Sequence, residues 1–258
     1  MSVFEAFLLG IVEGVTEFLP VSSTAHLILA SHLLGIDQSE SHKSFEIVVQ
    51  LGSISAVIFF YFRRLVGDRR LLLKLCAAFV PTGVIGLLFY RRIKELFSME
   101  IVCVSLIAGG ILLIAVELYM KRRDGAGGSD ALGRVSFGRA FLIGCAQCFA
   151  MIPGVSRSAA TIIGGLLCGL DRKTAIEFSF LLAVPTMLIA AGYDFTKNLS
   201  AFNSGDLLNL LIGFTTSFFV AVLAIRGFLK FVSKFSFIPF GIYRIAIGAV
   251  FLAFIAPR

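Results

Sequence analysis

The sequence predicts an all-α integral membrane protein with six transmembrane helices and two re-entrant helix–loop–helix regions, arranged as an inverted-topology repeat. Of the 258 residues, 58% are hydrophobic and 15% are charged, and the mean hydropathy is +0.94. A soluble domain of this composition would lack a polar surface, so we expect lipid to cover most faces. Six apolar segments are long enough to span a bilayer, and two further apolar regions are interrupted and resemble each other.

The first interrupted region is Val3–Gly35, which divides at Pro20 and the serines that follow it. Each half is too short to cross a hydrocarbon core of about 30 Å. A helix–loop–helix that enters and leaves on one side fits better, provided that protein or a water-filled cavity covers its backbone. The second region, Ala140–Gly169, divides in the same way at Pro153.

Three uninterrupted spans follow each of these regions. In chain order the six predicted spans are Phe45–Phe62, Leu71–Tyr90, Ile101–Met120, Ala175–Tyr193, Leu207–Ile225 and Phe240–Ala256. A polar, glycine-rich segment separates the two sets. We therefore expect a single membrane domain, residues 1–258, with repeat 1 at about 1–123, a linker at 124–133 and repeat 2 at about 134–258.

The two interrupted regions align without gaps. Gly10, Val21, Ser22 and Ala25 fall on Gly144, Val155, Ser156 and Ala159, and Glu13 falls on Gln147. Because three spans per half is an odd number, the halves must be inverted, which is a known way to build a polar site in lipid. In this arrangement one side carries more than twice as many Lys and Arg residues as the other, so we expect it to be cytoplasmic, although Arg91–Lys94 lies on the opposite side.

The net charge of +7 does not indicate nucleic acid as a partner. The basic residues cluster in short loops between apolar segments, and no basic stripe with interleaved aromatics is present. The five cysteines all lie in apolar stretches, which argues against a disulfide framework. Cys145 and Cys148 form a lone C-x-x-C, which we interpret as helix packing rather than a redox or metal motif.

The stretch "EGVTEFLPVSSTAH", Glu13–His26, places ionisable and hydroxyl groups where hydrocarbon is expected. Glu13 and Glu17 are four residues apart, so on a helix they share a face. Charged groups at this depth are costly and usually face a cavity or a partner, although a location at the membrane interface is the alternative. The three hydroxyl residues after Pro20 can cap the returning helix, whose free N–H groups bind anions; they are Ser22, Ser23 and Thr24.

The stretch "PGVSRSAAT", Pro153–Thr161, supplies the complementary charge. Gly154 permits a sharp turn, and Ser156, Ser158 and Thr161 offer hydroxyls. The guanidinium of Arg157 needs an anion, and its planar fork suits phosphate. Because no acidic residue lies in this region, we expect Arg157 to meet Glu13 or Glu17 from the other half, or the ligand.

Together these groups predict a site for phosphoryl transfer or phosphate hydrolysis. The nucleophile is left open between Ser23, His26 and a metal-activated water held by Glu13 and Glu17. Ser23 and His26 are three residues apart, so they share a face on the first helical turn. A carboxylate pair with substrate phosphates suits Mg²⁺ or Ca²⁺, whereas zinc would need further histidine or cysteine ligands.

With "FEIVVQLGSISAV" (Phe45–Val57) and "FSFLLAVPT" (Phe178–Thr186), the two polar stretches closely resemble the undecaprenyl-diphosphate phosphatases, the bacitracin-resistance phosphatases. The resemblance spans the whole chain. Ala25 and Ala159 stand where glycine is common in such motifs. The family pattern implies that the site is lined by Glu13, Glu17, Ser22, Ser23, Thr24, His26, Ser156, Arg157 and Thr161.

The resemblance implies a multi-pass enzyme of the bacterial cytoplasmic (inner) membrane, with its site facing the periplasm or cell exterior. The implied reaction converts undecaprenyl diphosphate to undecaprenyl phosphate, which recycles the lipid carrier for peptidoglycan synthesis. It also implies a divalent cation, Mg²⁺ or Ca²⁺, and we assign it to Glu13 and Glu17. Prenyl chain length and assembly as a homodimer are left open. We expect Glu13, Glu17, Ser23, His26 and Arg157 to be catalytic, and Ser22, Thr24, Gly154, Ser156, Ser158 and Thr161 to bind substrate.

A membrane transporter or lipid flippase is the alternative function. Inverted repeats with paired broken helices are typical of transporters, so the fold by itself favours that class. A transporter does not need a histidine and several serines beside two glutamates and an arginine, and this combination favours the phosphatase.

Overall fold

The computed structural model describes residues 1–36, 40–121, 132–197 and 207–255, and within these ranges all regular structure is helical. The helices are α1 (Val3–Thr16), α2 (Ser23–Leu33), α3 (Glu40–Gly67), α4 (Arg69–Leu88), α5 (Tyr90–Glu95), α6 (Met99–Lys121), η1 (Leu132–Arg134), α7 (Phe137–Gln147), η2 (Cys148–Met151), α8 (Arg157–Leu167), α9 (Arg172–Lys197), α10 (Leu207–Val232) and α11 (Ile238–Ile255). The predicted all-α membrane class is confirmed. The predicted linker, 124–133, lies almost wholly outside the described residues.

Five of the described helices are long and apolar enough to cross a membrane: α3, α4, α6, α9 and α10. They correspond to the first five predicted spans. The predicted sixth span, Phe240–Ala256, corresponds to α11, which has 18 residues and ranks with the shorter apolar helices. The number of six spans therefore stays a prediction.

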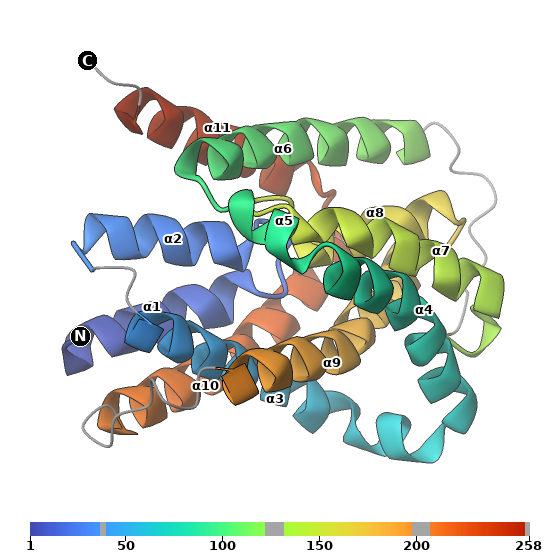
Figure 1. Cartoon of the computed structure of the whole chain (residues 1–258). Coiled ribbons are helices and arrows are strands. Elements are labelled where there is room, and N and C mark those ends of the chain that lie inside the picture. Colours follow the sequence, from blue (N-terminus) through green and yellow to red (C-terminus); the bar gives the residue numbers. More distant parts are fainter. Residues whose placement is uncertain (37–39, 122–131, 198–206, 256–258) are drawn as a thin grey trace.

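Each interrupted region forms a helical hairpin. The 14 residues of α1 and the 11 residues of α2 extend about 21 Å and 16 Å, too short to cross a hydrocarbon core of about 30 Å. The same holds for α7 and α8, with 11 residues each. The two hairpins occupy opposite ends of the view in Figure 1, α1–α2 at the left and α7–α8 at the right, and their turns lie toward the centre. Re-entry into a membrane remains a prediction for both.

The returning helix of each hairpin begins at a serine in an uncommon backbone conformation. Ser22 and Ser156 have φ of 73° and 78°, and they are the only described residues other than glycine with positive φ. Each side chain caps its helix, because the hydroxyl of Ser22 accepts from the N–H of Ala25 and that of Ser156 accepts from Ala159. Non-glycine residues in this region cost on the order of 1–3 kcal/mol and cluster at functional sites.

The packing partners of the two hairpins correspond. α1 packs along α10, α7 packs along α4, and α6 and α11 lie side by side across the top of Figure 1. Gly10 and Gly144, which align in the sequence, are both points of close approach. A Cβ at Gly10 would lie 2.9 Å from the carbonyl oxygen of Gly213, and one at Gly144 would lie 1.9 Å from that of Ala78. Small residues permit such approaches between membrane helices. The correspondence agrees with an internal repeat, whose boundaries stay a prediction.

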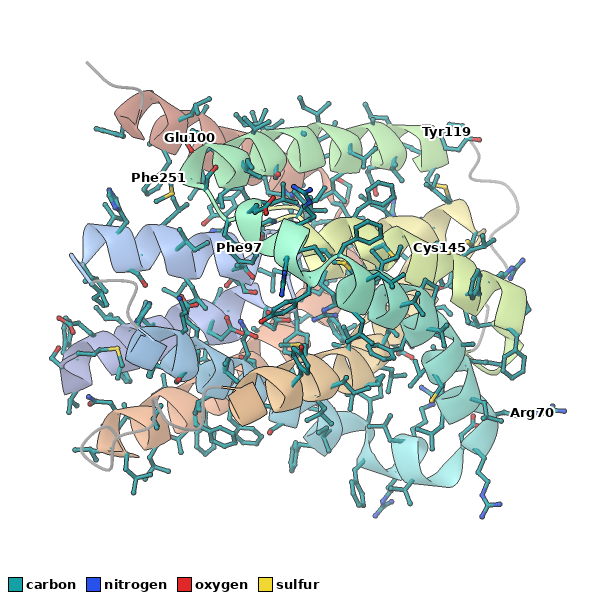
Figure 2. The ribbon with its side chains drawn as sticks, in the orientation of Figure 1. Arg70, Phe97, Glu100, Tyr119, Cys145 and Phe251 are labelled. Carbon is teal, nitrogen blue, oxygen red and sulfur yellow. The ribbon has the colours of Figure 1, made fainter. Side chains whose placement is uncertain are left out.

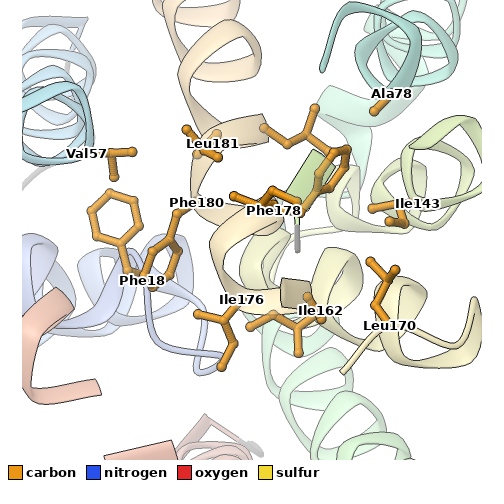
Figure 3. Close-up of a cluster of buried hydrophobic side chains, with 14 of the residues drawn as sticks. Phe18, Val57, Ala78, Ile143, Ile162, Leu170, Ile176, Phe178, Phe180 and Leu181 are labelled. Atoms are coloured by element: carbon orange, nitrogen blue, oxygen red, sulfur yellow. The ribbon is translucent and has the colours of Figure 1, made fainter. Parts of the chain in front are cut away.

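A continuous apolar core joins the turn after α1 to the second half of the chain. Phe18 is fully buried and packs edge-to-face on Phe180 of α9, with ring centroids 5.2 Å apart. Figure 3 shows this pair beside Val57 of α3, with Ile143 and Ile162 of the second hairpin across α9. The core therefore fixes the first turn against α9, which also carries contacts of the polar site.

We expect Gly144→Ala to destabilise the protein, because the added Cβ would overlap the Ala78 carbonyl. Overpacking of this kind costs about 1–3 kcal/mol. The measurement is the thermal unfolding temperature of the purified chain in detergent. The control is Gly192→Ala in α9, where a Cβ meets no atom within 4 Å. A Gly144→Ala protein as stable as this control would contradict the close packing of α4 and α7.

Candidate active site

A cavity of about 480 Å³ lies where the two hairpin turns meet. One part of its wall is polar and includes Glu17, Ser23 and Arg157. The remainder is mostly apolar and comes from α4, α5, the segment after α5, η2 and α9; it includes Phe79, Leu87, Ile93, Phe97, Met151, Met187 and Ile189. Figure 2 shows Phe97 beside α5, toward the middle of the molecule. The cavity can therefore hold a ligand with a polar group at one end and an apolar body.

Glu17 and Arg157 join the two hairpins. The guanidinium Nη2 of Arg157 lies 2.9 Å from Oε1 of Glu17, and the side chains are only 13% and 7% exposed. The two residues are 140 positions apart, and each is the charged residue of its own turn. The prediction that Arg157 meets a carboxylate of the first hairpin is confirmed.

The hydroxyl of Ser23 donates a hydrogen bond to Oε2 of Glu17. Glu17 ends α1 and Ser23 begins α2, so the turn between them folds the hydroxyl back onto the carboxylate. One carboxylate therefore contacts both the candidate nucleophile and the candidate phosphate ligand, Arg157. A carboxylate in this position is suited to accept the hydroxyl proton.

The guanidinium of Arg157 is held on several sides. Its Nη1 donates to the backbone carbonyl of Ser179 at 3.0 Å, and the group lies 5.8 Å from the centre of the Phe18 ring. Its Nε is buried and has no hydrogen-bond partner among the described residues. Because buried donors rarely lack an acceptor, this N–H needs an acceptor that the described residues do not supply.

The N-terminal ends of α2 and α8 both open on the cavity. Ser22 and Thr24 line it from the first hairpin, and Gly154 and Ser156 line it from the second. Unpaired N–H groups and the helix dipole at such ends favour anions. A cavity with two helix N-termini and a guanidinium at one end is suited to bind a phosphate group.

Ser158 and Thr161 lie outside the cavity lining. The hydroxyl of Ser158 donates to the carbonyl of Phe18 at 2.8 Å, which ties α8 to the first turn. Thr161 donates to the carbonyl of Arg157 and shares a 2.6 Å hydrogen bond with the hydroxyl of Ser179. Both hydroxyls support Arg157 and its surroundings in this structure, and their binding of substrate stays a prediction.

His26 faces away from Glu17. Its Nδ1 lies 2.7 Å from the carbonyl of Ser22, and its Nε2 lies 2.8 Å from the hydroxyl of Tyr243. A carbonyl oxygen only accepts, so Nδ1 carries the proton and Nε2 accepts from the tyrosine. The shared face of Ser23 and His26 would allow a hydrogen bond between them, but the Ser23 hydroxyl donates to Glu17 and the imidazole contacts Tyr243 of α11 instead.

Glu13 is fully buried behind the cavity wall. Neither of its carboxylate oxygens has a hydrogen-bond partner among the described residues. The negative charges of Glu17 and Glu46 disfavour an ionised Glu13, whereas the positive charge of Arg157 favours it. A buried carboxylate without a partner is costly, so Glu13 requires either a proton or a cation that the described side chains do not supply.

Several polar residues of the site were not predicted from the sequence. Gln147 donates to the hydroxyls of Thr82 and Thr186 at 2.9 Å and 3.2 Å, and all three line the cavity. Gln147 aligns with Glu13, and this correspondence was the available signal. Ser179 offers only a carbonyl to Arg157, which a sequence pattern does not reveal.

Five described helices able to cross a membrane, together with a guanidinium and two helix N-termini at one end of a mostly apolar cavity, define a multi-pass membrane protein whose cavity is suited to an amphipathic anion. The chain matches the family described as bacitracin resistance protein BacA over residues 6–250, and it belongs to this family.

Three relatives of the chain carry the same name. The chain is 55% identical to the undecaprenyl-diphosphatase of Sulfurihydrogenibium sp. over 97% of this chain and 98% of that protein. It is 54% identical to that of Persephonella marina, over 99% and 100% of the two chains. It is 46% identical to that of Methanococcus aeolicus, over 98% and 99%. The resemblance found in the two polar stretches is thereby confirmed.

We expect Glu17→Gln to destabilise the protein, because it leaves the Arg157 guanidinium buried without its counter-ion. Removing one partner of a buried pair costs about 3–5 kcal/mol. Thermal unfolding in detergent measures the effect. The control is Arg64→Gln, which breaks the Arg64–Glu177 pair, where the arginine side chain is 47% exposed. Such a pair contributes less than about 1 kcal/mol. Equal unfolding temperatures for the two variants would show that the Glu17–Arg157 pair does not stabilise the contact between the hairpins.

Proposed function

We propose that this chain is an undecaprenyl-diphosphate phosphatase, which converts undecaprenyl diphosphate to undecaprenyl phosphate and phosphate. This reaction recycles the lipid carrier for peptidoglycan synthesis and confers bacitracin resistance. The observation that carries the proposal is that the Glu17 carboxylate accepts hydrogen bonds from both Ser23 and Arg157 at the polar end of an apolar cavity. The relatives named above, at 46–55% identity over nearly the whole chain, support it.

Ser23 is the nucleophile of the proposed reaction. Its oxygen attacks the terminal phosphorus while its proton passes to Glu17. The bond from that phosphorus to the bridging oxygen breaks, and undecaprenyl phosphate leaves. Water then attacks the phosphoserine, the proton on Glu17 returns to the Ser23 oxygen, and phosphate leaves with the oxygen and protons of the water. The direct Ser23–Glu17 hydrogen bond supports this route over attack by His26, whose Nε2 is occupied by Tyr243.

Arg157 binds the terminal phosphate and stabilises the charge that develops on it. Its buried Nε, which has no partner among the described residues, can donate once a phosphate oxygen reaches it. When Glu17 takes the serine proton, the carboxylate loses its charge and the Nη2 of Arg157 becomes available as a second donor. The fork then binds phosphate through two N–H groups, as guanidinium geometry allows. The N-terminal N–H groups of α2 and α8 complete the anion site.

The residues of the site fit a hard divalent cation. Glu13 is buried with both oxygens outside hydrogen-bond geometry of the described residues, and the carboxylate of Glu17 lies close beside it. The described residues contain no group of three or more His, Cys, Asp or Glu side chains that could hold a metal ion. Mg²⁺ is commonly held by one or two carboxylates together with substrate phosphates. Glu13 and Glu17 would therefore hold Mg²⁺ or Ca²⁺, which supplies charge neutralisation to the diphosphate when bound.

The apolar part of the cavity accounts for a lipid substrate. Its wall combines aromatic and aliphatic side chains of α4, α5 and α9, next to the anion site. We place the protein in the bacterial cytoplasmic membrane, with the cavity facing the periplasm or cell exterior, as the family resemblance implies. The loop-charge argument made above concerns only which side is cytoplasmic. Membrane lipid is its other partner, and assembly as a homodimer stays an open prediction.

The alternative of a transporter or flippase rests on the matched hairpins and their meeting turns. The two functions differ in one measurable respect. A phosphatase releases phosphate in detergent micelles, where no compartments exist, whereas transport requires two sides.

We expect the purified chain to release phosphate from a prenyl diphosphate in detergent, and Arg157→Lys to lose most of this activity although it keeps the charge. An ammonium cannot reproduce the fork that contacts Glu17, Ser179 and phosphate together. The measurement is kcat/KM. A loss smaller than about threefold, or ~0.65 kcal/mol, would mean that Arg157 contributes only its charge. No phosphate release by the unaltered chain would favour the transporter.

We expect rapid acid quench with substrate labelled in the terminal phosphate to leave acid-stable phosphoserine at Ser23. Ser23→Ala should abolish the label, and Thr24→Ala, which changes the neighbouring hydroxyl, should retain it. Acid-labile phosphate on His26 would show that the imidazole is the nucleophile. Absence of label from the protein during a single turnover would favour direct attack by water.

A further inference from the structure

Arg244 of α11 is the most completely buried cation of the described residues, with 0% of the residue exposed. Its guanidinium donates four hydrogen bonds, and all of them go to backbone carbonyls: Pro20 at 3.1 Å, Gly154 at 2.9 Å, Ser105 at 3.3 Å and Leu106 at 3.3 Å. No described carboxylate lies within ion-pair distance of it. The charge is therefore stabilised by main-chain dipoles of three separate segments.

Two of these carbonyls occupy equivalent places in the two hairpins. The gapless alignment that pairs Ser22 with Ser156 also pairs Pro20 with Gly154. Each carbonyl stands two residues before the positive-φ serine that caps its returning helix. Nη1 binds the first turn and Nη2 binds the second. One planar group thus fixes both turns relative to each other and to α6.

The contacts of Arg244 differ in kind from the other contacts between the turns. The Arg157–Glu17 pair must open in the proposed reaction, because Glu17 accepts a proton and Arg157 turns to phosphate. Hydrogen bonds to main-chain carbonyls do not depend on either event. An ionised group at this depth is costly, and an apolar side chain could fill the space without that cost. Compared with an apolar side chain, the arginine therefore adds only its four hydrogen bonds to backbone carbonyls.

We propose that Arg244 is a positioning residue that holds the two hairpin turns in register while the Glu17–Arg157 pair opens, so that Ser23 and Arg157 stay aligned on the diphosphate. This proposal rests on the proposed function. Arg244 touches neither Ser23 nor Arg157 by any hydrogen bond of the described residues, so it acts through the backbone of the turns. Small displacements of reacting groups are known to cost up to about 100-fold in rate.

Gly109 of α6 offers a way to move this guanidinium without changing it. A Cβ at Gly109 would lie 2.0 Å from Nη2 and 2.8 Å from Cζ of Arg244, and its three nearest atoms all belong to Arg244. The guanidinium is the end of a flexible side chain, so it would shift to make room. Gly109→Ala should therefore disturb the same four contacts as a substitution of Arg244 itself.

The experiment compares Arg244→Lys and Gly109→Ala in the purified full-length chain in detergent, with a prenyl diphosphate of fixed length. An ammonium keeps the charge but cannot span carbonyls of three segments. The matched controls are Arg172→Lys, which alters an arginine whose side chain is 37% exposed and pairs with the buried Glu117 at 2.5 Å, and Gly227→Ala in α10, where a Cβ meets no atom within 4 Å.

We expect kcat to fall at least ~tenfold in both variants while KM changes less than ~threefold, and both controls to stay within ~twofold of the unaltered chain. Amide hydrogen exchange should rise in both turns, residues 17–24 and 152–158, without a matching rise in α4 and α7. A folded variant with unchanged kcat would overturn the proposal. Loss of the folded protein in both variants would also overturn it, because Arg244 would then be needed for folding alone.

The exchange measurement separates this proposal from the proposed function. If the unaltered chain releases no phosphate, the phosphatase assignment fails, yet coupled exposure of the two turns in Gly109→Ala would still show that Arg244 holds them together. If the unaltered chain is active but amide exchange rises in only one turn of the variants, the phosphatase assignment stands and the proposed coupling of the turns by Arg244 fails.

Discussion

The ion pair between Glu17 and Arg157 is the interaction on which the arrangement of the two halves depends. Each charge lies in an apolar region that carries no neutralising partner within its own turn, and an isolated charge in a low-dielectric interior is strongly unfavourable. The cost is removed only when the hairpins meet, with 2.9 Å between the two groups. Function and assembly are therefore linked, because the same contact that neutralises the charges creates the polar end of the cavity.

Backbone geometry prepares this contact. Ser22 and Ser156 hold their turns in matching positive-φ conformations, and each caps a helix whose N-terminus opens on the cavity. Phe18 fixes the first turn against α9, and Ser158 ties α8 to the carbonyl of Phe18. Arg244 adds carbonyl contacts to both turns. The site is consequently built on backbone that is restrained from several directions, as a preorganised anion site requires.

Chemistry and lipid binding are separated within one cavity. At the polar end, one carboxylate accepts from the Ser23 hydroxyl and pairs with Arg157, so in the proposed reaction proton transfer and release of the guanidinium would be coupled through Glu17. At the apolar end, the lining is mostly aromatic and aliphatic side chains, which suit a prenyl chain. Glu13, buried and with no hydrogen-bond partner among the described residues, is the residue on which the proposed divalent cation mainly rests.

The sequence by itself determined the class of protein, the two interrupted regions and the charges that meet. Composition and segment length are local properties, and the lone guanidinium of Arg157 required an acid from elsewhere in the chain. The tertiary structure decided which acid, because Glu13 and Glu17 share a helical face but only Glu17 stands at the turn. It also decided that Ser23 forms a hydrogen bond with Glu17 and His26 one with Tyr243. The non-helical backbone of the turn sets the directions of these side chains, and helical spacing does not describe such a backbone. The partners of Arg244 were beyond any pattern of side chains, because they are main-chain carbonyls that only the folded chain brings to one point.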